Sequence, residues 1–279
     1  MSILKAIFLG LVQGICEFLP ISSSGHLSIF QNLFALDYTA DEHLLFDVML
    51  HVGTLAAVCV FYWKDIRSIV TDTVAFANGG GNGEEGRFKP SVRLLFLIAI
   101  ATLPLLIVVP FQGAVEKLSG NTPFISFALI VTGVLLYVSG KLAEGRRNEK
   151  TASLLDALAV GAAQAVAVIP GLSRSGATIT VGLSRGFRRE FAVRFSFLLS
   201  IPAVLGSALV TLFKAILVGG IEWSSVPAYI IGMIVAGVVG YFALVLIKKL
   251  ILSGDTFSKF AYYCWGAGVL SLILSLFLG

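Results

Sequence analysis

The sequence predicts an all-α integral membrane protein with six transmembrane helices and two re-entrant broken-helix hairpins, arranged as an inverted-topology repeat. Three observations lead to this prediction: an apolar composition, apolar segments of membrane-spanning length, and a polar pattern that occurs twice. Of the 279 residues, 57% are hydrophobic and only 13% are charged, and the mean hydropathy is +0.93. A soluble domain carries about 25% charged residues, so most of this chain belongs in lipid.

Six segments are long and apolar enough to cross a bilayer, whose hydrocarbon core requires about 20 helical residues. These predicted spans are 46–63, 93–111, 122–140, 191–213, 226–247 and 260–278. Two further apolar stretches, 3–19 and 154–169, end in clusters of Pro, Ser and Gly that are followed by another short apolar piece. Non-helical backbone at membrane depth is tolerated only where protein or a water-filled cavity covers it. We therefore predict re-entrant hairpins over 3–40 and 154–185.

The two interrupted stretches repeat one another at a shift of 151 residues without a gap. Five positions are identical: Gly10, Gln13, Ser22, Ser24 and Gly25 match Gly161, Gln164, Ser173, Ser175 and Gly176. Three predicted spans lie between the copies, and an odd number inverts the second copy relative to the first. We predict one membrane domain over 1–279, made of inverted repeats 1–140 and 154–279. Such repeats place their site where the copies meet, near the bilayer midplane.

Basic residues are distributed unevenly between the two sides of this topology. Three lysines, Lys5, Lys117 and Lys214, fall on one side, whereas the other side carries sixteen Lys and Arg residues in its loops. The positive-inside rule makes the basic side cytoplasmic, so both termini and the opening of the site are predicted to face the outside. Contact with anionic lipids accounts for the basic loops, and no nucleic-acid partner is expected. The three cysteines are isolated in apolar runs and form neither a disulfide framework nor a zinc site.

Arg174 is the residue that says most about the function. It lies in the sequence Pro-Gly-Leu-Ser-Arg-Ser-Gly-Ala-Thr, which spans residues 170–178 directly after an apolar run. A guanidinium at membrane depth costs roughly 2.5–3.5 kcal/mol and stays charged, so it needs a permanent anionic partner or an anionic ligand. Hydroxyl groups and glycine amides surround it, and these are the donors that bind phosphate. We interpret the segment as a phosphate-binding loop.

The first interrupted helix carries a small and polar stripe. Gly10, Gln13, Gly14 and Glu17 follow one another at spacings of three and four residues and so share one helix face. Close helix packing explains the glycines equally well, but it does not explain a carboxylate that is costly to bury. We interpret Glu17 as functional, and the alternative is a purely structural ion pair with Arg174.

A serine triplet and a histidine follow this helix in the segment 22–26. One serine is expected to cap the next short helix, and His26 considered alone is as easily structural as functional. Beside Glu17 and the serines, a catalytic role is favoured for His26. The cases for His43 and His51 are weaker, because the first lies in a polar connector and the second suits a packing or supporting role within a span.

The two copies differ in their charged residues. Glu17 and His26 are replaced in the second copy by Val168 and Ala177, whereas Arg174 is replaced in the first copy by a serine. The first copy therefore offers acid–base and nucleophile candidates, and the second offers a fixed cation. Together they resemble a phosphoryl-transfer site, in which cations and hydroxyls bind the equatorial oxygens while an oriented group attacks.

Two motifs, at residues 13–26 and 170–176, resemble the signatures of a known family. Gln-x-x-x-Glu-Phe-Leu-Pro-Ile-Ser-Ser-Ser-Gly-His over residues 13–26 is similar to the first signature of the bacterial undecaprenyl-diphosphatases, the bacitracin-resistance proteins. Pro-Gly-Leu-Ser-Arg-Ser-Gly over 170–176 is similar to their second. The resemblance extends over the whole chain. It implies a multi-pass phosphatase of the bacterial inner membrane that acts on a polyprenyl pyrophosphate lipid among membrane lipids, and it leaves the oligomeric state open.

The resemblance implies an activity and residue roles. The family removes the terminal phosphate of undecaprenyl pyrophosphate, which recycles the lipid carrier of cell-wall synthesis and confers bacitracin resistance. Glu17 matches its essential glutamate, Ser23 a proposed nucleophile, and His26 a proposed base or alternative nucleophile. The residues assigned to phosphate binding are Ser22, Ser24, Gly25, Ser173, Arg174, Ser175, Gly176 and Thr178.

The resemblance also implies a divalent cation, with Mg²⁺ expected and Ca²⁺ as the alternative. Glu17 and Gln13 are its candidate ligands. Many members have a second glutamate where this chain has Gln13, and the loss of that carboxylate argues against a strong metal site made of protein alone.

The expected mechanism joins the two motifs. Arg174 binds the phosphates with both arms of its guanidinium, and Ser23 attacks the terminal phosphorus while His26 takes its proton. Attack by His26, or by a water that Glu17 activates, is an equal alternative. The alternative function is a transporter or flippase for a lipid phosphate or another anion, because inverted repeats of broken helices are common in transporters.

Overall fold

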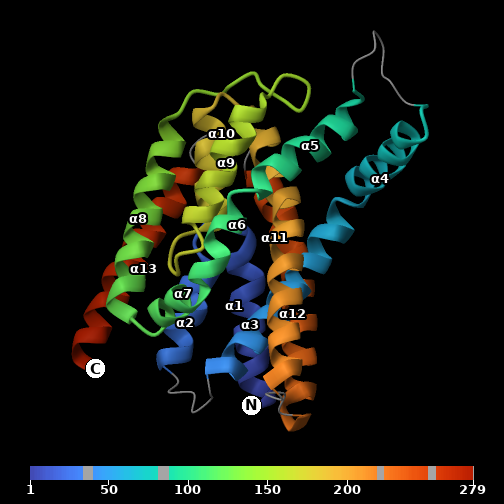
Figure 1. Cartoon of the computed structure of the whole chain (residues 1–279). Helices are drawn as coiled ribbons and strands as arrows, with labels where there is room; N and C mark the ends of the chain where they lie inside the picture. Colours follow the sequence, from blue (N-terminus) through green and yellow to red (C-terminus); the bar gives the residue numbers. More distant parts are fainter. Residues whose placement is uncertain (34–39, 81–87, 219–222, 251–255, 279) are drawn as a thin grey trace.

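The computed structural model describes residues 1–33, 40–80, 88–218, 223–250 and 256–278. Within these ranges the chain is a bundle of helices, and an isolated β-bridge joins Arg147 to Phe187. Figure 1 shows both termini at the lower end of the bundle and the loop that follows helix α8 at its upper end. The side chains of the connector 41–43, where His43 was predicted to be solvated, lie outside the described part.

Capping side chains determine where several helices begin. Ser2, Asn121, Ser153 and Ser173 each accept a hydrogen bond from a backbone N–H in the first turn of the helix that follows. The helices are α1 (Ile3–Phe18), α2 (Ser23–Leu33), α3 (Ala40–Phe61), α4 (Trp63–Ala77), α5 (Pro90–Thr102), α6 (Leu105–Val108), α7 (Gln112–Ser119), α8 (Thr122–Lys141), α9 (Leu154–Val166), α10 (Arg174–Ser184), α11 (Arg189–Val218), α12 (Val226–Leu250) and α13 (Thr256–Leu278). Short 3-10 turns, η2 (Val109–Phe111) and η3 (Trp223–Ser225), complete the described elements.

Five helical segments in the described part are long and apolar enough to cross a membrane, and a bent pair makes a sixth if it is counted as one span. The five are Pro90–Val115, Thr122–Lys141, Arg189–Phe213, Trp223–Leu250 and Phe257–Phe277. They coincide with five of the six predicted spans, so the chain is a multi-pass membrane protein. The two interrupted segments form shorter helices, α1 with α2 and α9 with α10, as the sequence predicts.

The predicted span 46–63 ends in a bend. Leu45–Phe61 meets Trp63–Ala77 at an angle of 75°. Charged residues, among them Lys64 and Arg67, begin at this point, and α4 buries none of its side chains within the described structure. The span therefore ends where the composition changes, and α4 is an amphipathic continuation that the sequence analysis did not separate.

The predicted span 93–111 is also interrupted. Helix α5 ends at Thr102, and Pro104 directly precedes α6. A proline lacks the N–H that would continue the ladder, and its ring clashes with the carbonyl four residues earlier. Pro110 shapes η2 in the same way. The segment 90–119 is therefore a series of short helices. Helix α11, in contrast, is continuous although it contains Pro202.

The helices of the interrupted segments pack in equivalent ways. Helix α1 packs against α12, and α9 packs against α5. A glycine permits each contact: a Cβ at Gly10 would lie 2.6 Å from the Gly232 carbonyl oxygen, and a Cβ at Gly161 would clash with the Ala101 carbonyl oxygen. Helix α3 packs against α11 and α8 against α13 (Figure 1), so each of these pairs joins the two halves of the chain.

The turns after α1 and α9 share their hydrogen bonds residue by residue. The Ser22 hydroxyl accepts from the Gly25 N–H at 3.2 Å, and the Ser173 hydroxyl accepts from the Gly176 N–H at 3.0 Å. Each of these serines also contacts the hydroxyl of the serine two residues on. Ser22 has a positive φ of 71°, a strained conformation for a residue with a side chain. The hydrogen bonds of the first turn thus recur in the second, whereas the backbone differs, because Ser173 has a φ of −76° where Ser22 has a positive φ.

A buried carboxylate ties the loops together at the upper end of the bundle. Asp156 is fully buried and accepts hydrogen bonds from Arg147 at 2.5 Å, from Arg185 at 2.8 Å and from the Ser153 N–H at 2.9 Å. Burial acts to raise the pKa of Asp156, but the hydrogen bonds from Ser153, Arg185 and Arg147 outweigh it and lower this pKa to about 2. Arg147 continues into the bridge with Phe187.

We expect Gly161→Ala to lower the thermal unfolding midpoint in detergent, because the added methyl group meets the α5 backbone. Overpacking of this kind costs about 1–3 kcal/mol. Gly266→Ala is the matched control: this helical glycine has open space at its Cβ, so the higher helix propensity of alanine should leave the midpoint unchanged or raise it. Equal midpoints for the two variants would contradict the assigned packing.

We expect acid to weaken the loops around Asp156. A depressed carboxyl pKa contributes stability that is fully present above the ordinary aspartate value of about 4 and is lost as the pH falls toward 2. The unfolding midpoint of the wild type should therefore fall between about pH 4 and pH 2. Asp156→Asn should start lower at neutral pH and lose less on acidification, and equal acid sensitivity of the two proteins would refute the role of this carboxylate.

Candidate anion site between the interrupted helices

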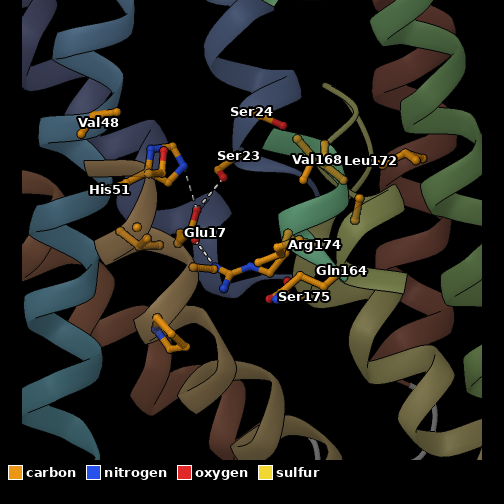
Figure 2. A pocket seen from close by; sticks show the side chains of 18 of the residues that line it. Glu17, Ser23, Ser24, Val48, His51, Gln164, Val168, Leu172, Arg174 and Ser175 are labelled. Atoms are coloured by element: carbon orange, nitrogen blue, oxygen red, sulfur yellow. Dashed lines mark hydrogen bonds and ion pairs between the residues drawn. The ribbon is translucent and has the colours of Figure 1, made fainter. Parts of the chain in front are cut away.

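A cavity of about 530 Å³ lies beside the turns that follow α1 and α9, against α3, α6 and α11 (Figure 2). One of its walls is polar and another is apolar. The polar wall includes Glu17, Ser23, His51, Gln164, Arg174 and Ser175. The apolar wall includes Leu105, Leu106, Val109, Val204 and Val210. The cavity can therefore hold a ligand that is anionic at one end and apolar at the other.

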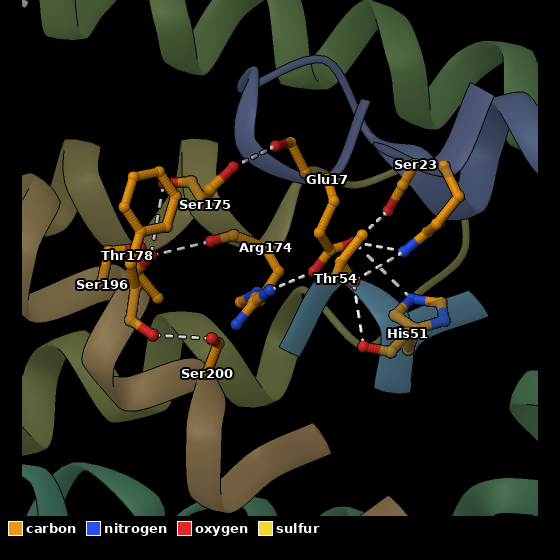
Figure 3. Close-up of polar contacts among 12 residues, drawn as sticks. Glu17, Ser23, His51, Thr54, Arg174, Ser175, Thr178, Ser196 and Ser200 are labelled. Atoms are coloured by element: carbon orange, nitrogen blue, oxygen red, sulfur yellow. Dashed lines mark hydrogen bonds and ion pairs between the residues drawn. The ribbon is translucent and has the colours of Figure 1, made fainter. Parts of the chain in front are cut away.

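Glu17 is the centre of the polar wall and is 7% exposed. Its Oε2 accepts hydrogen bonds from the Ser23 hydroxyl at 2.6 Å and from Gln13 Nε2 at 3.0 Å, and His51 Nε2 lies 3.6 Å away. Its Oε1 accepts a hydrogen bond from Nη2 of Arg174 (Figure 3). Side chains from α1, α2, α3 and α10 thus converge on one carboxylate.

Arg174 is the first residue of α10, and the cap at Ser173 fixes its backbone. One terminal nitrogen, Nη2, binds Glu17. The other, Nη1, is buried and has no hydrogen-bond partner among the described residues. A buried donor without a partner costs about 1–3 kcal/mol. The Arg174 side chain lines the cavity, so a ligand bound there could supply the acceptor that Nη1 lacks.

The second turn is held in place by α8 and by the first turn. The Thr132 hydroxyl donates to the Gly171 carbonyl at 3.0 Å and accepts from the Ser173 N–H at 3.0 Å. Gly171 has a φ of +91°, which favours glycine. Its N–H donates to the Ser24 hydroxyl at 3.5 Å, and a Cβ at Gly25 would lie only 3.0 Å from its Cα. The two turns are therefore in direct contact.

The structure brings most of the predicted site residues to the cavity. The predicted residues that line it are Glu17, Ser22, Ser23, Ser24, Ser173, Arg174 and Ser175. Gly25 and Gly176 are close by, but their N–H groups already donate to the capping serines. The Thr178 hydroxyl contacts Ser196 at 2.6 Å and donates to the Arg174 carbonyl at 2.9 Å (Figure 3), so it fastens α10 to α11 and does not line the cavity.

The structure turns His26 away from the predicted nucleophile. One ring nitrogen, Nδ1, lies 2.8 Å from the Ser22 carbonyl, and Nε2 lies 2.9 Å from the hydroxyl of Tyr263 on α13, with the two rings stacked. His26 does not line the cavity. The group that accepts the hydrogen bond of the Ser23 hydroxyl is Glu17, so this geometry favours Glu17 over His26 as the partner of Ser23.

Sequence reasoning undervalued two residues of the cavity. His51 was assigned a supporting role at most, although it lies next to the Glu17 carboxylate. Gln164 was used only to define the repeat, although it is 1% exposed and lines the cavity (Figure 2). A signal existed for each: a histidine within an apolar span, and an amide retained at the same position in both copies.

The predicted metal ligands, Glu17 and Gln13, are too few to bind a metal ion by themselves. No group of three or more His, Cys, Asp or Glu side chains that could hold a metal ion occurs among the described residues. Glu17 is one carboxylate, and the adjacent Gln13 Oε1 is a buried oxygen without a partner in the described structure. Mg²⁺ is commonly held by one or two carboxylates together with substrate phosphates. The donors fit a cation that is shared with phosphates, and they do not form a cage of their own.

Fold and site together define a class: a multi-pass helical membrane protein with a buried Arg–Glu–Ser cluster facing an amphipathic cavity. Comparison with known proteins then specifies the family. Residues 6–270 match the family model "Bacitracin resistance protein BacA", and the chain belongs to that family.

Several relatives match over nearly their full length. One from Halothermothrix orenii is 40% identical over 277 residues, which covers 99% of both chains. One from Methanosphaera stadtmanae is 39% identical over 284 residues, which covers both chains completely. One from Carboxydothermus hydrogenoformans is 38% identical over 279 residues, with 98% of both chains covered. Each of the three is named undecaprenyl-diphosphatase.

We expect Thr132→Val to destabilise the protein and to reduce its ability to bind anions at the cavity. Valine has the shape of threonine but leaves the Gly171 carbonyl and the Ser173 N–H without their partner, at about 1–3 kcal/mol for each group. Thr132→Ser retains the hydroxyl and should keep both properties close to wild type. The thermal unfolding midpoint with and without a lipid diphosphate measures both, and a midpoint for Thr132→Val equal to that of Thr132→Ser would contradict the role of the hydroxyl.

Proposed function

We propose that this protein is an undecaprenyl-diphosphatase. It hydrolyses undecaprenyl pyrophosphate to undecaprenyl phosphate and inorganic phosphate, which recycles the lipid carrier for cell-wall synthesis and confers bacitracin resistance. The observation that carries the proposal is the Ser23 hydroxyl, which is hydrogen-bonded at 2.6 Å to a carboxylate that is itself paired with a buried arginine. The family and the names of its full-length relatives support the same activity.

The two walls of the cavity suit the two ends of this substrate. The diphosphate takes the polar wall, where Arg174 and the hydroxyls of Ser173 and Ser175 supply donors. The first part of the prenyl chain takes the apolar wall formed by α6, η2 and α11, and the rest remains in lipid. An apolar ligand group in such a wall gains about 25 cal/mol per Å² of buried surface, so the tail contributes affinity while the phosphates determine orientation.

Ser23 and Glu17 perform the chemistry in this proposal. The Ser23 oxygen attacks the terminal phosphorus and its proton passes to Glu17 Oε2, its hydrogen-bond partner. The bond between the terminal phosphorus and the bridging oxygen breaks, and undecaprenyl phosphate leaves. Glu17 passes this proton to the departing lipid phosphate and is ionised again. It then takes a proton from a water that attacks the phosphoserine phosphorus, and it gives that proton to the Ser23 oxygen as the bond between phosphorus and serine oxygen breaks and inorganic phosphate leaves. A water or His26 as the attacking group remains the alternative, although His26 has both ring nitrogens engaged elsewhere.

Arg174 changes partners in this scheme. Before substrate binds, its guanidinium neutralises Glu17. A diphosphate carries more negative charge than a carboxylate and accepts bidentate hydrogen bonds from a guanidinium, so Arg174 turns to the phosphates. Glu17 then loses its guanidinium partner, and its Oε2 becomes able to take the proton of Ser23. Substrate binding and the activation of the nucleophile are coupled in this way.

A divalent cation, Mg²⁺ or alternatively Ca²⁺, is part of the proposal, with Glu17 and Gln13 as its protein ligands. Such an ion would neutralise charge that develops on the phosphate oxygens. The support is the unpartnered Gln13 Oε1 next to the Glu17 carboxylate.

The membrane arrangement that we propose is an inverted repeat, with α1–α2 and α9–α10 as re-entrant hairpins between six spans. The equivalent packing of α1 on α12 and of α9 on α5 supports it. In the bacterial inner membrane the basic loops would face the cytoplasm, and the termini and cavity opening would face outside.

A flippase for the lipid phosphate is the second candidate function. The matched turns and paired helices favour it, since transporters are commonly built this way.

The decisive assay is phosphate release from undecaprenyl pyrophosphate by the purified protein in detergent, with Mg²⁺ or with a chelator. We expect Ser23→Ala, Glu17→Gln and Arg174→Lys each to lose at least about 100-fold in kcat/KM. The lysine variant retains the charge but lacks the planar fork that holds two phosphate oxygens. A folded wild type that releases no phosphate would reject the phosphatase and favour the flippase, which movement of lipid phosphate across liposomes then tests.

Rapid quenching identifies the nucleophile. We expect an acid-stable phosphoserine to accumulate on the wild type during turnover and to be absent from Ser23→Ala. An acid-labile, base-stable adduct would assign the attack to His26 instead. Phosphate release at the wild-type rate by Ser23→Ala would exclude the serine mechanism.

A further inference from the structure

Gln164 lines the cavity, and nothing in the mechanism above uses it. It lies on α9, is 1% exposed, and lines the cavity. Both polar atoms of its amide, Nε2 and Oε1, are buried and have no hydrogen-bond partner in the described part of the chain. A buried amide without partners is costly, so its presence calls for a ligand group that completes its hydrogen bonds.

The first copy of the repeat shows what such an amide holds. Gln13 occupies the matching position, and its Nε2 donates to the carboxylate of Glu17 at 3.0 Å. The residue that matches Glu17 in the second copy is Val168, which also lines the cavity. Gln164 therefore retains the donor but lacks the anion. A ligand anion next to Val168 would stand in the place that the carboxylate takes in the first copy.

A second unfilled donor lines the same cavity. Arg174 binds Glu17 through Nη2, while its buried Nη1 has no partner in the described structure. Figure 2 shows Gln164 and Ser175 on the Arg174 side of the cavity, across from Ser23 and His51. The Gln164 amide and Nη1 of Arg174, neither of which has an acceptor among the described residues, make a matched pair of donors for the oxygens of one phosphate group.

The position of Gln164 determines which phosphate it would hold. Ser23 and Glu17, which act on the terminal phosphate, lie on the other side of Arg174 (Figure 2). Helix α9, which carries Gln164, packs against α5 and α6, and α6 supplies Leu105 and Leu106 to the apolar wall. The phosphate attached to the prenyl chain lies nearest to that wall.

We propose that Gln164 binds the lipid-linked phosphate of the substrate, together with Nη1 of Arg174, and thereby selects lipid diphosphates and positions the terminal phosphate at Ser23. The proposal rests on the phosphatase function proposed above. The amide Nε2 donates to a phosphate oxygen, and Oε1 accepts from a water or from a protonated phosphate oxygen. Gln164 binds and positions the substrate and takes no part in proton transfer.

The experiment compares Gln164→Met and Gln164→Glu with Asn78→Met, which removes an exposed amide that does not line the cavity. For Gln164→Met we expect KM for undecaprenyl pyrophosphate to rise roughly ten- to a hundredfold. Inhibition by a prenyl monophosphate should weaken by a similar factor, whereas inhibition by inorganic phosphate should not change. Gln164→Glu should be affected more strongly, because its carboxylate repels the phosphate. Asn78→Met should match wild type in all three measurements.

Thermal unfolding separates this binding role from a structural one. Because the Gln164 amide has no hydrogen-bond partner to lose among the described residues, Gln164→Met should keep or raise the unfolding midpoint of the ligand-free protein. It should also lose most of the midpoint increase that a methylene-bridged prenyl bisphosphonate gives the wild type. A lower midpoint without ligand, or an unchanged KM and an unchanged increase, would overturn the proposal. If the wild type releases no phosphate, the phosphatase function fails, and the bisphosphonate measurement still tests Gln164.

Discussion

The structure of the site depends on one ion pair, between Glu17 on α1 and Arg174 on α10. Neither charge is tolerable alone at this depth in an apolar bundle. Each comes from a different interrupted helix, 157 residues apart in the sequence. The pair therefore requires the two turns to meet, and the contacts between them, Ser24 with Gly171 and Gly25 with Gly171, bring them close enough. The packing of the two turns and the pairing of the two charges therefore depend on the same contact.

Around this pair the chain satisfies its polar groups with short side chains. Serine and threonine hydroxyls cap the helices that restart after each turn, and Thr132 serves both a carbonyl and an N–H of the second turn. Small residues permit the close helix contacts that hold the interrupted segments, as Gly10 and Gly161 illustrate. Among the described residues, buried polar side-chain atoms without partners occur on Gln13, Gln164 and Arg174 at the site, and also on Thr73, Arg93, Arg189 and Arg194 away from it. A bound ligand would supply partners to those that line the cavity.

Much of this could be predicted from the sequence because the physical signals were strong. Apolar length predicted the spans, and a charge and a carboxylate in apolar helices predicted the partnership of Glu17 with Arg174. What sequence reasoning missed depends on the direction of side chains. His26 follows the serines closely in the sequence, but its ring binds Ser22 and Tyr263. The break at Pro104 was hidden by continuous hydrophobicity, since hydropathy does not register a missing N–H.

The contact between the two turns has a consequence for how the site can change. The turns meet through glycine backbone, where even a methyl group at Gly25 would approach Gly171 closely. The separation of the two turns is therefore set by contact between backbone atoms, which cannot be exchanged as side chains can. A change in the head group that the cavity accepts would then have to come from its lining, at residues such as Gln164 or Val168.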